Sequence, residues 1–408
     1  MYLDWLNRDG KLLLSARIVR AFAYGFLSIV LAIYLKLVGF DEILIGIILS
    51  ATLVNSVIFT MVASFYADKI GRRKILLVYA VLMSASGAIF FTTENYIALV
   101  VAALIGTINV TGAETGSFLS IEQAVLPQTI KKLHKRTTAF AIYNTVGTFA
   151  MAAGVLLSGL PKIIQNGFGL SDVDSIKPLF LLYCILALVV FAIYSFLSKK
   201  IELEVKAGDT TKKTVISQKS KGIIAKLSGL FAVDAFAGGF VIQSIVSFWF
   251  FTKFGADLPT LAMIFSLAGV LTALSYLAAT RIAGRVGLVN TMVFTHMASN
   301  VLIIFVAFAP SFYLALGLYL ARVSLSQMDV PTRQSYIVAI VGERERIAAA
   351  GITNTSRNVA QAVSPSITGV IIQSLWLSAP FVIGGVLKIA YDVGLYLSFR
   401  KIKPPEET

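Results

Sequence analysis

Ionisable residues lie inside long apolar stretches of this sequence, where a charge is costly, and six of them are candidate site residues. They are Arg20, Glu114, Asp234, Arg322, Asp329 and Arg357. A charged side chain surrounded by hydrocarbon normally pairs with another charge, faces a watery cavity, or serves a solute or proton site. We therefore take the three carboxylates as candidates for proton coupling and the three arginines as candidates for holding an anionic solute.

Glu114 has a local sequence that suits a proton site. It lies between Gly112 and Gly116, and small residues at this spacing let a second helix pack closely. Close packing would remove water from the carboxylate and let it bind and release a proton near neutral pH. The alternative is an ordinary satisfied carboxylate, paired with Arg20 or Arg322 or bonded to nearby hydroxyl groups.

The amino-acid composition indicates that the long apolar stretches lie in a membrane. The 408-residue chain is 57% hydrophobic and 14% charged, whereas soluble domains carry roughly 25% charged residues. Apolar runs of about 20 residues, the length that crosses a bilayer, recur along the chain. We expect an all-α integral membrane protein with about twelve transmembrane helices. The expected spans are residues 12–36, 42–66, 74–93, 96–124, 138–162, 178–198, 223–252, 258–280, 288–309, 312–338, 346–373 and 379–399.

Lysine and arginine predict the orientation and the division of the chain. The net charge of +14 sits in alternate loops, which indicates cytoplasmic loops and cytoplasmic termini and gives no reason to expect nucleic acid as a partner. The one long hydrophilic connection is rich in Lys, Thr and Ser. We expect an N-terminal six-helix half at 1–198, a cytoplasmic linker at 199–222, a C-terminal half at 223–400 and a cytoplasmic tail at 401–408.

The two halves repeat each other. RAFAYGF at Arg20–Phe26 matches DAFAGGF at Asp234–Phe240, and RTTAFAIYNT at Arg136–Thr145 matches RIAAAGITNT at Arg346–Thr355. Parallel repeats predict a pseudo-two-fold axis along the membrane normal with a solute path between the halves. The first match places opposite charges at equivalent depths. Either they form an ion pair across the gate, or each pairs within its own half.

The loop between the second and third spans carries a recognisable signature. Residues 64–74 read SFYADKIGRRK, which closely resembles the cytoplasmic motif G-x-x-x-D-R-x-G-R-R-K of the major facilitator superfamily. Serine at position 64 and lysine at 69 are mild departures. The resemblance implies a secondary transporter that works by alternating access, with spans one, four, seven and ten lining the cavity. It also implies a cytoplasmic gate latched by Asp68, Gly71, Arg72 and Arg73.

Two further pairings are expected near these sites. Glu122, at the inner end of the fourth span, is the expected partner of Arg72 or Arg73, and the repeat places Arg333 at the equivalent position of the second half. Lys388 and Asp392 are spaced i, i+4 in the last span, which predicts a structural pair.

Several functional classes lack their motifs. The sequence has no G-x-x-x-x-G-K-[ST] loop for ATP, no nucleophile elbow and no paired catalytic carboxylates, so we expect neither an enzyme nor an ATP-driven pump. The two histidines and the single Cys184 do not suggest a metal centre. We expect no cofactor.

These observations favour a carrier for a small organic solute in the cytoplasmic membrane, with protons as the coupling ion and the lipid bilayer as its surroundings. A monomer suffices for this fold. The leading hypothesis is efflux by solute/proton antiport. The second is an importer or facilitator of an anionic metabolite held by Arg20, Arg322 or Arg357. The third is a transport-inactive receptor or scaffold.

Overall fold

The computed structural model describes residues 6–112, 116–130, 136–202, 217–330, 332–333, 336 and 346–402. Within these ranges the regular structure is helical, apart from one isolated bridge between Leu6 and Ile130. Helices are the expected form because an apolar segment in a bilayer must satisfy its backbone hydrogen bonds internally.

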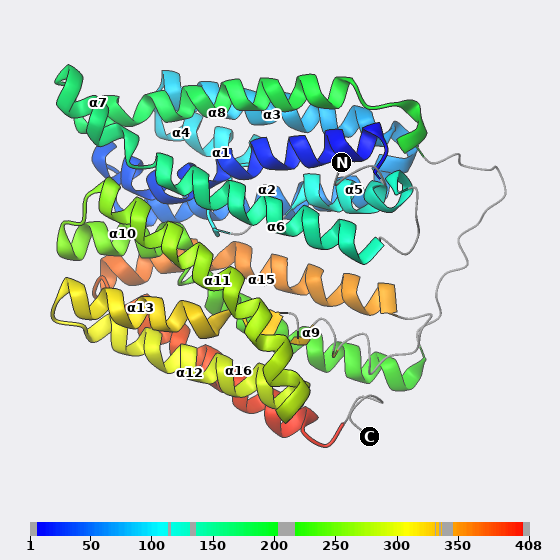
Figure 1. Ribbon diagram of the computed structural model, residues 1–408. Helices are drawn as coiled ribbons and strands as arrows, with labels where there is room; N and C mark the ends of the chain where they lie inside the picture. Colours follow the sequence, from blue (N-terminus) through cyan, green and yellow to red (C-terminus); the bar gives the residue numbers. More distant parts are fainter. Residues whose placement is uncertain are drawn as a thin grey trace. The chain divides into compact units, whose positions relative to one another are not determined.

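The chain forms two compact units, and the first contains Met1–Asp209 together with Ile242–Ser266. Its helices (Figure 1) are α1 (Arg8–Val38), α2 (Glu42–Ile70), α3 (Arg72–Thr92), α4 (Tyr96–Ile105), α5 (Ser117–Val125), α6 (Arg136–Leu157), α7 (Leu160–Phe168), α8 (Asp172–Ser195) and α10 (Gln243–Phe254), with 3-10 turns at Leu126–Thr129 and Lys199–Ile201.

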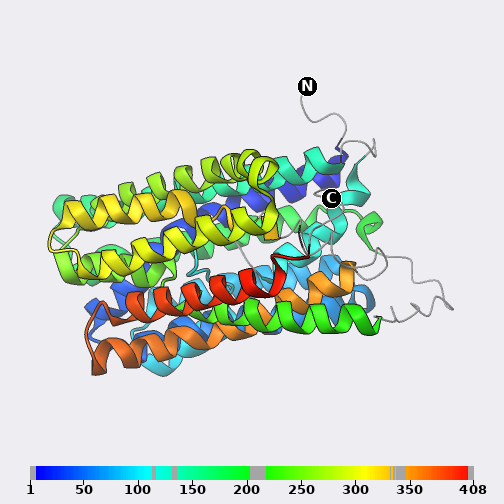
Figure 2. The ribbon, with the colours of Figure 1, turned by 90° about the horizontal axis from the view of Figure 1, so that it is seen from below.

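The second unit contains Thr210–Val241 and Leu267–Thr408. Its helices are α9 (Gln218–Gly239), most of α11 (Leu258–Val286), α12 (Leu288–Phe308), α13 (Phe312–Ser326), α15 (Arg346–Ser374) and α16 (Ala379–Phe399). Figure 2 shows α9, α15 and α16 side by side, in green, orange and red.

The helix packing repeats between the two units. In the first unit α1 packs on α6 and α3 packs on α8; in the second, α9 packs on α15 and α12 packs on α16. The matched RAFAYGF and DAFAGGF segments lie on α1 and α9. The two pseudo-symmetric halves predicted from the sequence are therefore present in the packing.

The outer surfaces of the helices suit lipid. Nine helices in the described ranges are long and apolar enough to cross a membrane. Large apolar side chains are exposed on these helices and on α4. Examples are Ile97 on α4 at 72% exposure, Leu188 on α8 at 53% and Val386 on α16 at 53%. Contiguous exposed apolar surface of this kind is rare on soluble monomers.

Four of the expected continuous spans differ from the described helices. The fifth, expected over 138–162, breaks between Leu157 and Leu160, and in the tenth, expected over 312–338, helix α13 ends at Ser326.

The fourth span, expected over 96–124, ends its first helix at Ile105 and resumes as α5 at Ser117. Gly112 and Gly116 have φ angles of +79° and +109°, which a right-handed helix does not allow. The seventh breaks between Gly239 and Gln243, so α9 and α10 are separate helices.

Helix α10 packs with the first unit although it follows the linker in sequence. The Oγ of Ser244 donates a 2.7 Å hydrogen bond to the carbonyl of Ser28 on α1, and the Oγ of Ser247 donates at 3.1 Å to the carbonyl of Ile29. Gln243 Nε2 donates to Ser28 Oγ at 2.9 Å. These bonds explain why the segment Ile242–Ser266 belongs to the first unit.

Candidate functional site

The first unit contains a buried ion pair between α1 and α5. Both terminal nitrogens of the Arg20 guanidinium reach Glu122, with Nη2 2.6 Å from Oε2 and Nη1 2.9 Å from Oε1, and both side chains are fully buried. Tyr143 on α6 donates to Oε2 at 2.5 Å, and Tyr194 on α8 donates to Oε1 at 2.8 Å. One carboxylate therefore joins four helices.

Aromatic rings complete the surroundings of this pair. The Arg20 guanidinium lies 4.5 Å from the centre of the Phe118 ring, and the Arg17 guanidinium lies 4.8 Å from the centre of the Tyr143 ring. A buried charge pair is tolerated only when its geometry is good and its remaining hydrogen-bonding sites are filled. Both conditions hold at Arg20 and Glu122.

The expected pairing of Glu122 with Arg72 or Arg73 is wrong. Glu122 is occupied by Arg20 and two tyrosines inside the bundle, whereas the two arginines contact the start of the linker. The Glu202 carboxylate accepts hydrogen bonds from the backbone nitrogens of Arg72 at 2.6 Å and Arg73 at 3.2 Å. A carboxylate at this place suits the positive end of helix α3.

The signature loop is a tight turn between α2 and α3. Gly71 occupies it with a φ angle of +110°, a conformation that favours glycine. The Arg72 side chain donates to the carbonyl of Ile201, and the Arg73 side chain donates to the carbonyl of Ser195. The side chain of Asp68 lies outside the described residues, and the gating role of this loop stays a prediction.

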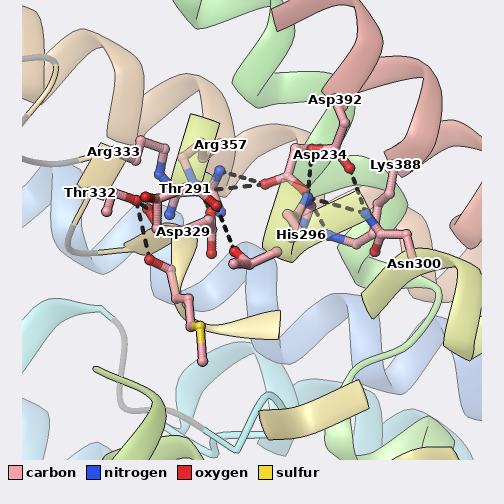
Figure 3. Close-up of polar contacts among 12 residues, drawn as sticks. Asp234, Thr291, His296, Asn300, Asp329, Thr332, Arg333, Arg357, Lys388 and Asp392 are labelled. Atoms are coloured by element: carbon pink, nitrogen blue, oxygen red, sulfur yellow. Dashed lines mark hydrogen bonds and ion pairs between the residues drawn. The ribbon is translucent and has the colours of Figure 1, made fainter. Parts of the chain in front are cut away.

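The second unit contains a larger network centred on Asp234 of α9 (Figure 3). Lys388 Nζ on α16 lies 2.6 Å from Oδ1, and Arg357 Nη1 on α15 lies 2.8 Å from Oδ2. Arg333 Nη1 lies 3.6 Å from Oδ2 and 2.5 Å from Oδ2 of Asp329. The Asp234 side chain is only 3% exposed, so these cations replace the water that it has lost.

His296 on α12 extends the network to a third carboxylate. Its Nε2 lies 3.6 Å from Asp234 Oδ1, and its Nδ1 lies 2.8 Å from Asp392 Oδ1. Asn300 Nδ2, one turn along α12, donates to Asp392 Oδ2 at 2.9 Å. In Figure 3 these side chains form one continuous group beside Lys388.

The structure corrects the expected pairing of Lys388 with Asp392. Lys388 donates to Asp234, and Asp392 accepts from His296 and Asn300. The i, i+4 spacing does put both residues on one face of α16, but α9 and α12 offer each of them a partner. Sequence reasoning did not assign His296 or Asn300 to this site, although two charges in one apolar span were a signal that polar partners must lie nearby.

The two networks contain an equivalent ion pair with its charges exchanged. Arg20 corresponds to Asp234 in the repeats, and Glu122 corresponds to Arg333. The first pair joins Arg20 to Glu122 at 2.6 Å, and the second brings Arg333 within 3.6 Å of Asp234. Of the two alternatives for Arg20 and Asp234, the ion pairs in each unit agree with pairing within its own half.

Of the candidate residues that the structure describes, Arg322 stands apart from these networks. Arg322 on α13 has no carboxylate partner among the residues that the structure describes, and its buried Nε has no hydrogen-bond partner there. Glu114 lies outside the described residues.

Comparison with known proteins identifies the family. A family model described as Major Facilitator Superfamily matches residues 13–326, so the chain belongs to this superfamily. It is a multi-pass membrane protein with the twelve-helix fold of these transporters, and it is a secondary transporter.

Individual relatives agree with this assignment. A Saccharomyces cerevisiae protein described as an uncharacterized membrane protein is 27% identical over 424 aligned residues, covering 96% of this chain and 94% of that protein. The crystal structure of the nucleoside transporter NupG superposes with a TM-score of 0.73 at 13% identity, over 97% of this chain and 100% of that one. The D-xylose-proton symporter superposes with a TM-score of 0.73 at 16% identity, over 97% of each chain.

Proposed function

We propose that this transporter carries a small organic anion by alternating access, with proton coupling. The substrate class rests on the environment of Arg322. Of the three arginines considered for anion binding, Arg20 is paired with Glu122 and Arg357 with Asp234. Arg322 has no carboxylate partner among the described residues.

A partly buried guanidinium without a counter-charge is unfavourable, because burial removes water that would otherwise stabilise the charge. A carboxylate or phosphate on the solute would supply that charge and would form bidentate hydrogen bonds with the planar guanidinium. Binding of the anion would thus offset the burial of Arg322.

Proton coupling has support from named relatives. The arabinose-proton symporter of Bacillus subtilis is 26% identical over 114 residues, which is 28% of this chain, and the D-xylose-proton symporter shares the fold. The network around Asp234 adds ionisable groups that are buried inside the second unit.

The test is counterflow of labelled carboxylates and phosphate esters in proteoliposomes. We expect Arg322→Gln to weaken solute affinity about 10-fold or more, because a hydrogen bond to a charged group contributes about 1.5–3 kcal/mol. The solute affinity of Arg322→Lys should lie between those of the unsubstituted protein and Arg322→Gln, since lysine keeps the charge and loses the bidentate geometry. Arg281→Gln removes an exposed arginine of α11 and serves as the matched control. Unchanged affinity in Arg322→Gln would exclude the anion site.

Solute efflux by proton antiport is the second candidate, and the buried ionisable groups around Asp234 favour it. In the same vesicles an outward solute flux must then be driven by an inward proton gradient. Asp234→Asn, Asp329→Asn and Glu114→Gln test its proton sites. Normal pH-driven flux in all three variants would show that none of these carboxylates is the proton site. A scaffold would show no counterflow with any solute.

The location that we propose is the cytoplasmic membrane, with both termini inside. The distribution of lysine and arginine among the loops supports the orientation. A fluorescent fusion at the C-terminus, imaged with a quencher that cannot cross the membrane, tests both parts of this proposal.

A further inference from the structure

His296 is buried between two carboxylates that come from different helices. Its side chain is 5% exposed, that of Asp392 is fully buried and that of Asp234 is 3% exposed. An ionised carboxylate only accepts hydrogen bonds, so the 2.8 Å contact requires a hydrogen on Nδ1 when Asp392 is ionised. The amide nitrogen of Asn300, 3.1 Å from Nδ1, then donates to Asp392 and not to the ring. The other nitrogen, Nε2, then has a free lone pair and lies 3.6 Å from Asp234 Oδ1.

The charges around His296 balance when the imidazole is neutral. Among the described residues, four side chains contact the imidazole directly: Asp234 on α9, Asn300 on α12, and Tyr391 and Asp392 on α16. Four more are joined to it through Asp234: Arg357 on α15, Lys388 on α16, and Arg333 with its partner Asp329 beyond the end of α13. Three aspartates oppose two arginines and one lysine. A proton on His296 would change the net charge of these described groups from zero to +1, with the imidazolium lying between Asp234 and Asp392.

Asp234 and Asp329 already have cationic partners, whereas Asp392 accepts from the neutral side chains of His296 and Asn300. Asp234 has Lys388 at 2.6 Å and Arg357 at 2.8 Å, and Asp329 has Arg333 at 2.5 Å. Protonating either carboxylate would leave a buried cation without its counter-charge, which is costly. Protonating His296 instead places an imidazolium between two existing negative charges, those of Asp234 and Asp392.

We propose that His296 is the group that binds and releases the coupling proton of this transporter. A proton from the aqueous phase adds to the Nε2 lone pair, the imidazolium donates from Nδ1 to Asp392 and from Nε2 to Asp234, and release returns the same proton to water. This inference deepens the proposed function by naming the residue that would couple protons to transport.

Protonation at Nε2 would change the contacts between α9, α15 and α16, because Asp234 joins these helices. This carboxylate joins α9 to α15 through Arg357 and to α16 through Lys388. A new donor at Oδ1 competes with Lys388 for the same oxygen, which weakens one helix contact when the proton binds. Arg357 is the most exposed of the charged side chains in this network, at 24%.

The experiment compares two histidine variants in proteoliposomes. His296→Gln should lose accumulation driven by a pH gradient at least about 10-fold and should keep solute exchange at equal pH, because only the proton step is removed. His134→Gln replaces the other histidine of the chain and should keep both activities. Accumulation by His296→Gln at the level of the unsubstituted protein would overturn the proposal.

A second measurement does not need a transported solute. The melting temperature of the detergent-purified protein is recorded as a function of pH for the unsubstituted protein, for His134→Gln and for His296→Gln. A group that binds a proton more tightly in the folded than in the unfolded state, or the reverse, produces a step in this curve. If His296 is that group, the step should be present in the unsubstituted protein and in His134→Gln. The step should be absent in His296→Gln, and its presence there would overturn the proposal. Failure of every anion in counterflow would instead overturn the proposed substrate class, and this step would still report on His296.

Asp392→Asn guards against a misfolded histidine variant. The change keeps the side-chain size and removes the carboxylate that accepts from Nδ1, so the step should remain but change its midpoint. Loss of the step in Asp392→Asn would assign the proton to Asp392 and overturn the proposal. A step at an unchanged pH would contradict the assignment of His296 as the titrating group.

Discussion

At the residue scale, Arg20 and Glu122 show how a charged pair is kept inside an apolar bundle. Their side chains are fully buried, and their two short contacts use both terminal guanidinium nitrogens and both carboxylate oxygens. Tyr143 and Tyr194 fill the remaining acceptor positions of the carboxylate. Such a pair is costly to break because each charge has lost its water.

We predict that Glu122→Gln destabilises the protein by about 3–5 kcal/mol, the usual loss when one partner of a buried ion pair is removed. Glutamine keeps the size of the side chain and an oxygen for the tyrosines, so the change isolates the charge. Thermal unfolding in detergent measures it.

The matched control for this prediction is the pair of Lys36 and Glu42, whose side chains are 37% and 21% exposed. Glu42→Gln should cost less than about 1 kcal/mol, because exposed ion pairs contribute little. Equal losses in the two variants would show that burial does not set the strength of the Arg20–Glu122 pair.

At the element scale, α1 and α6 approach each other through their backbones. A Cβ atom added at Gly154 of α6 would meet the carbonyl oxygen of Phe22, and one added at Gly25 of α1 would meet the carbonyl oxygen of Met151. Backbone atoms cannot turn away as a flexible side chain can, so a larger residue must push the helices apart.

We predict that Gly154→Ala lowers stability by about 1–3 kcal/mol, the usual cost of overpacking. Gly229→Ala on α9 is the control, because nothing lies within 4 Å of a Cβ at that position. It should be neutral or stabilising by about 0.5–1 kcal/mol through helix propensity. Melting curves of both variants measure the difference, and a neutral Gly154→Ala would argue against close contact of α1 with α6.

At the scale of the whole molecule, the boundary between the two compact units does not follow the linker, because the first unit also contains Ile242–Ser266. The start of the linker is held on the first unit, where Ser198 donates to Asp9 from its backbone nitrogen at 2.9 Å and its Oγ at 2.6 Å. Further along, α10 returns to that same unit and bonds to α1 through Ser244 and Ser247.

We predict that residues 1–209 and 210–408, produced as separate chains in one cell, purify together. The second fragment carries the segment Ile242–Ser266, which completes the first unit. Affinity purification through a tag on the first fragment measures the yield of the second. Ser244→Ala with Ser247→Ala should lower that yield, and recovery of the first fragment alone from the unsubstituted pair would contradict the prediction.

Local sequence properties determined the class of this protein. The length of the apolar runs, the distribution of lysine and arginine and the matched RAFAYGF and DAFAGGF segments indicated a twelve-helix transporter of two repeated halves. These properties survive folding because a bilayer accepts few structures other than apolar helices. The breaks at Gly112 and at Gly239 were less evident, since glycine is also tolerated inside transmembrane helices.

Only the tertiary structure decided which charges meet. Glu122 binds Arg20, 102 residues away, in preference to the nearer signature loop, and Lys388 binds Asp234 across 154 residues in preference to Asp392 on its own helix. His296 joins the site because α12 packs on α16. A buried charge takes whichever counter-charge the helix packing brings to it, and no spacing along one helix encodes that choice.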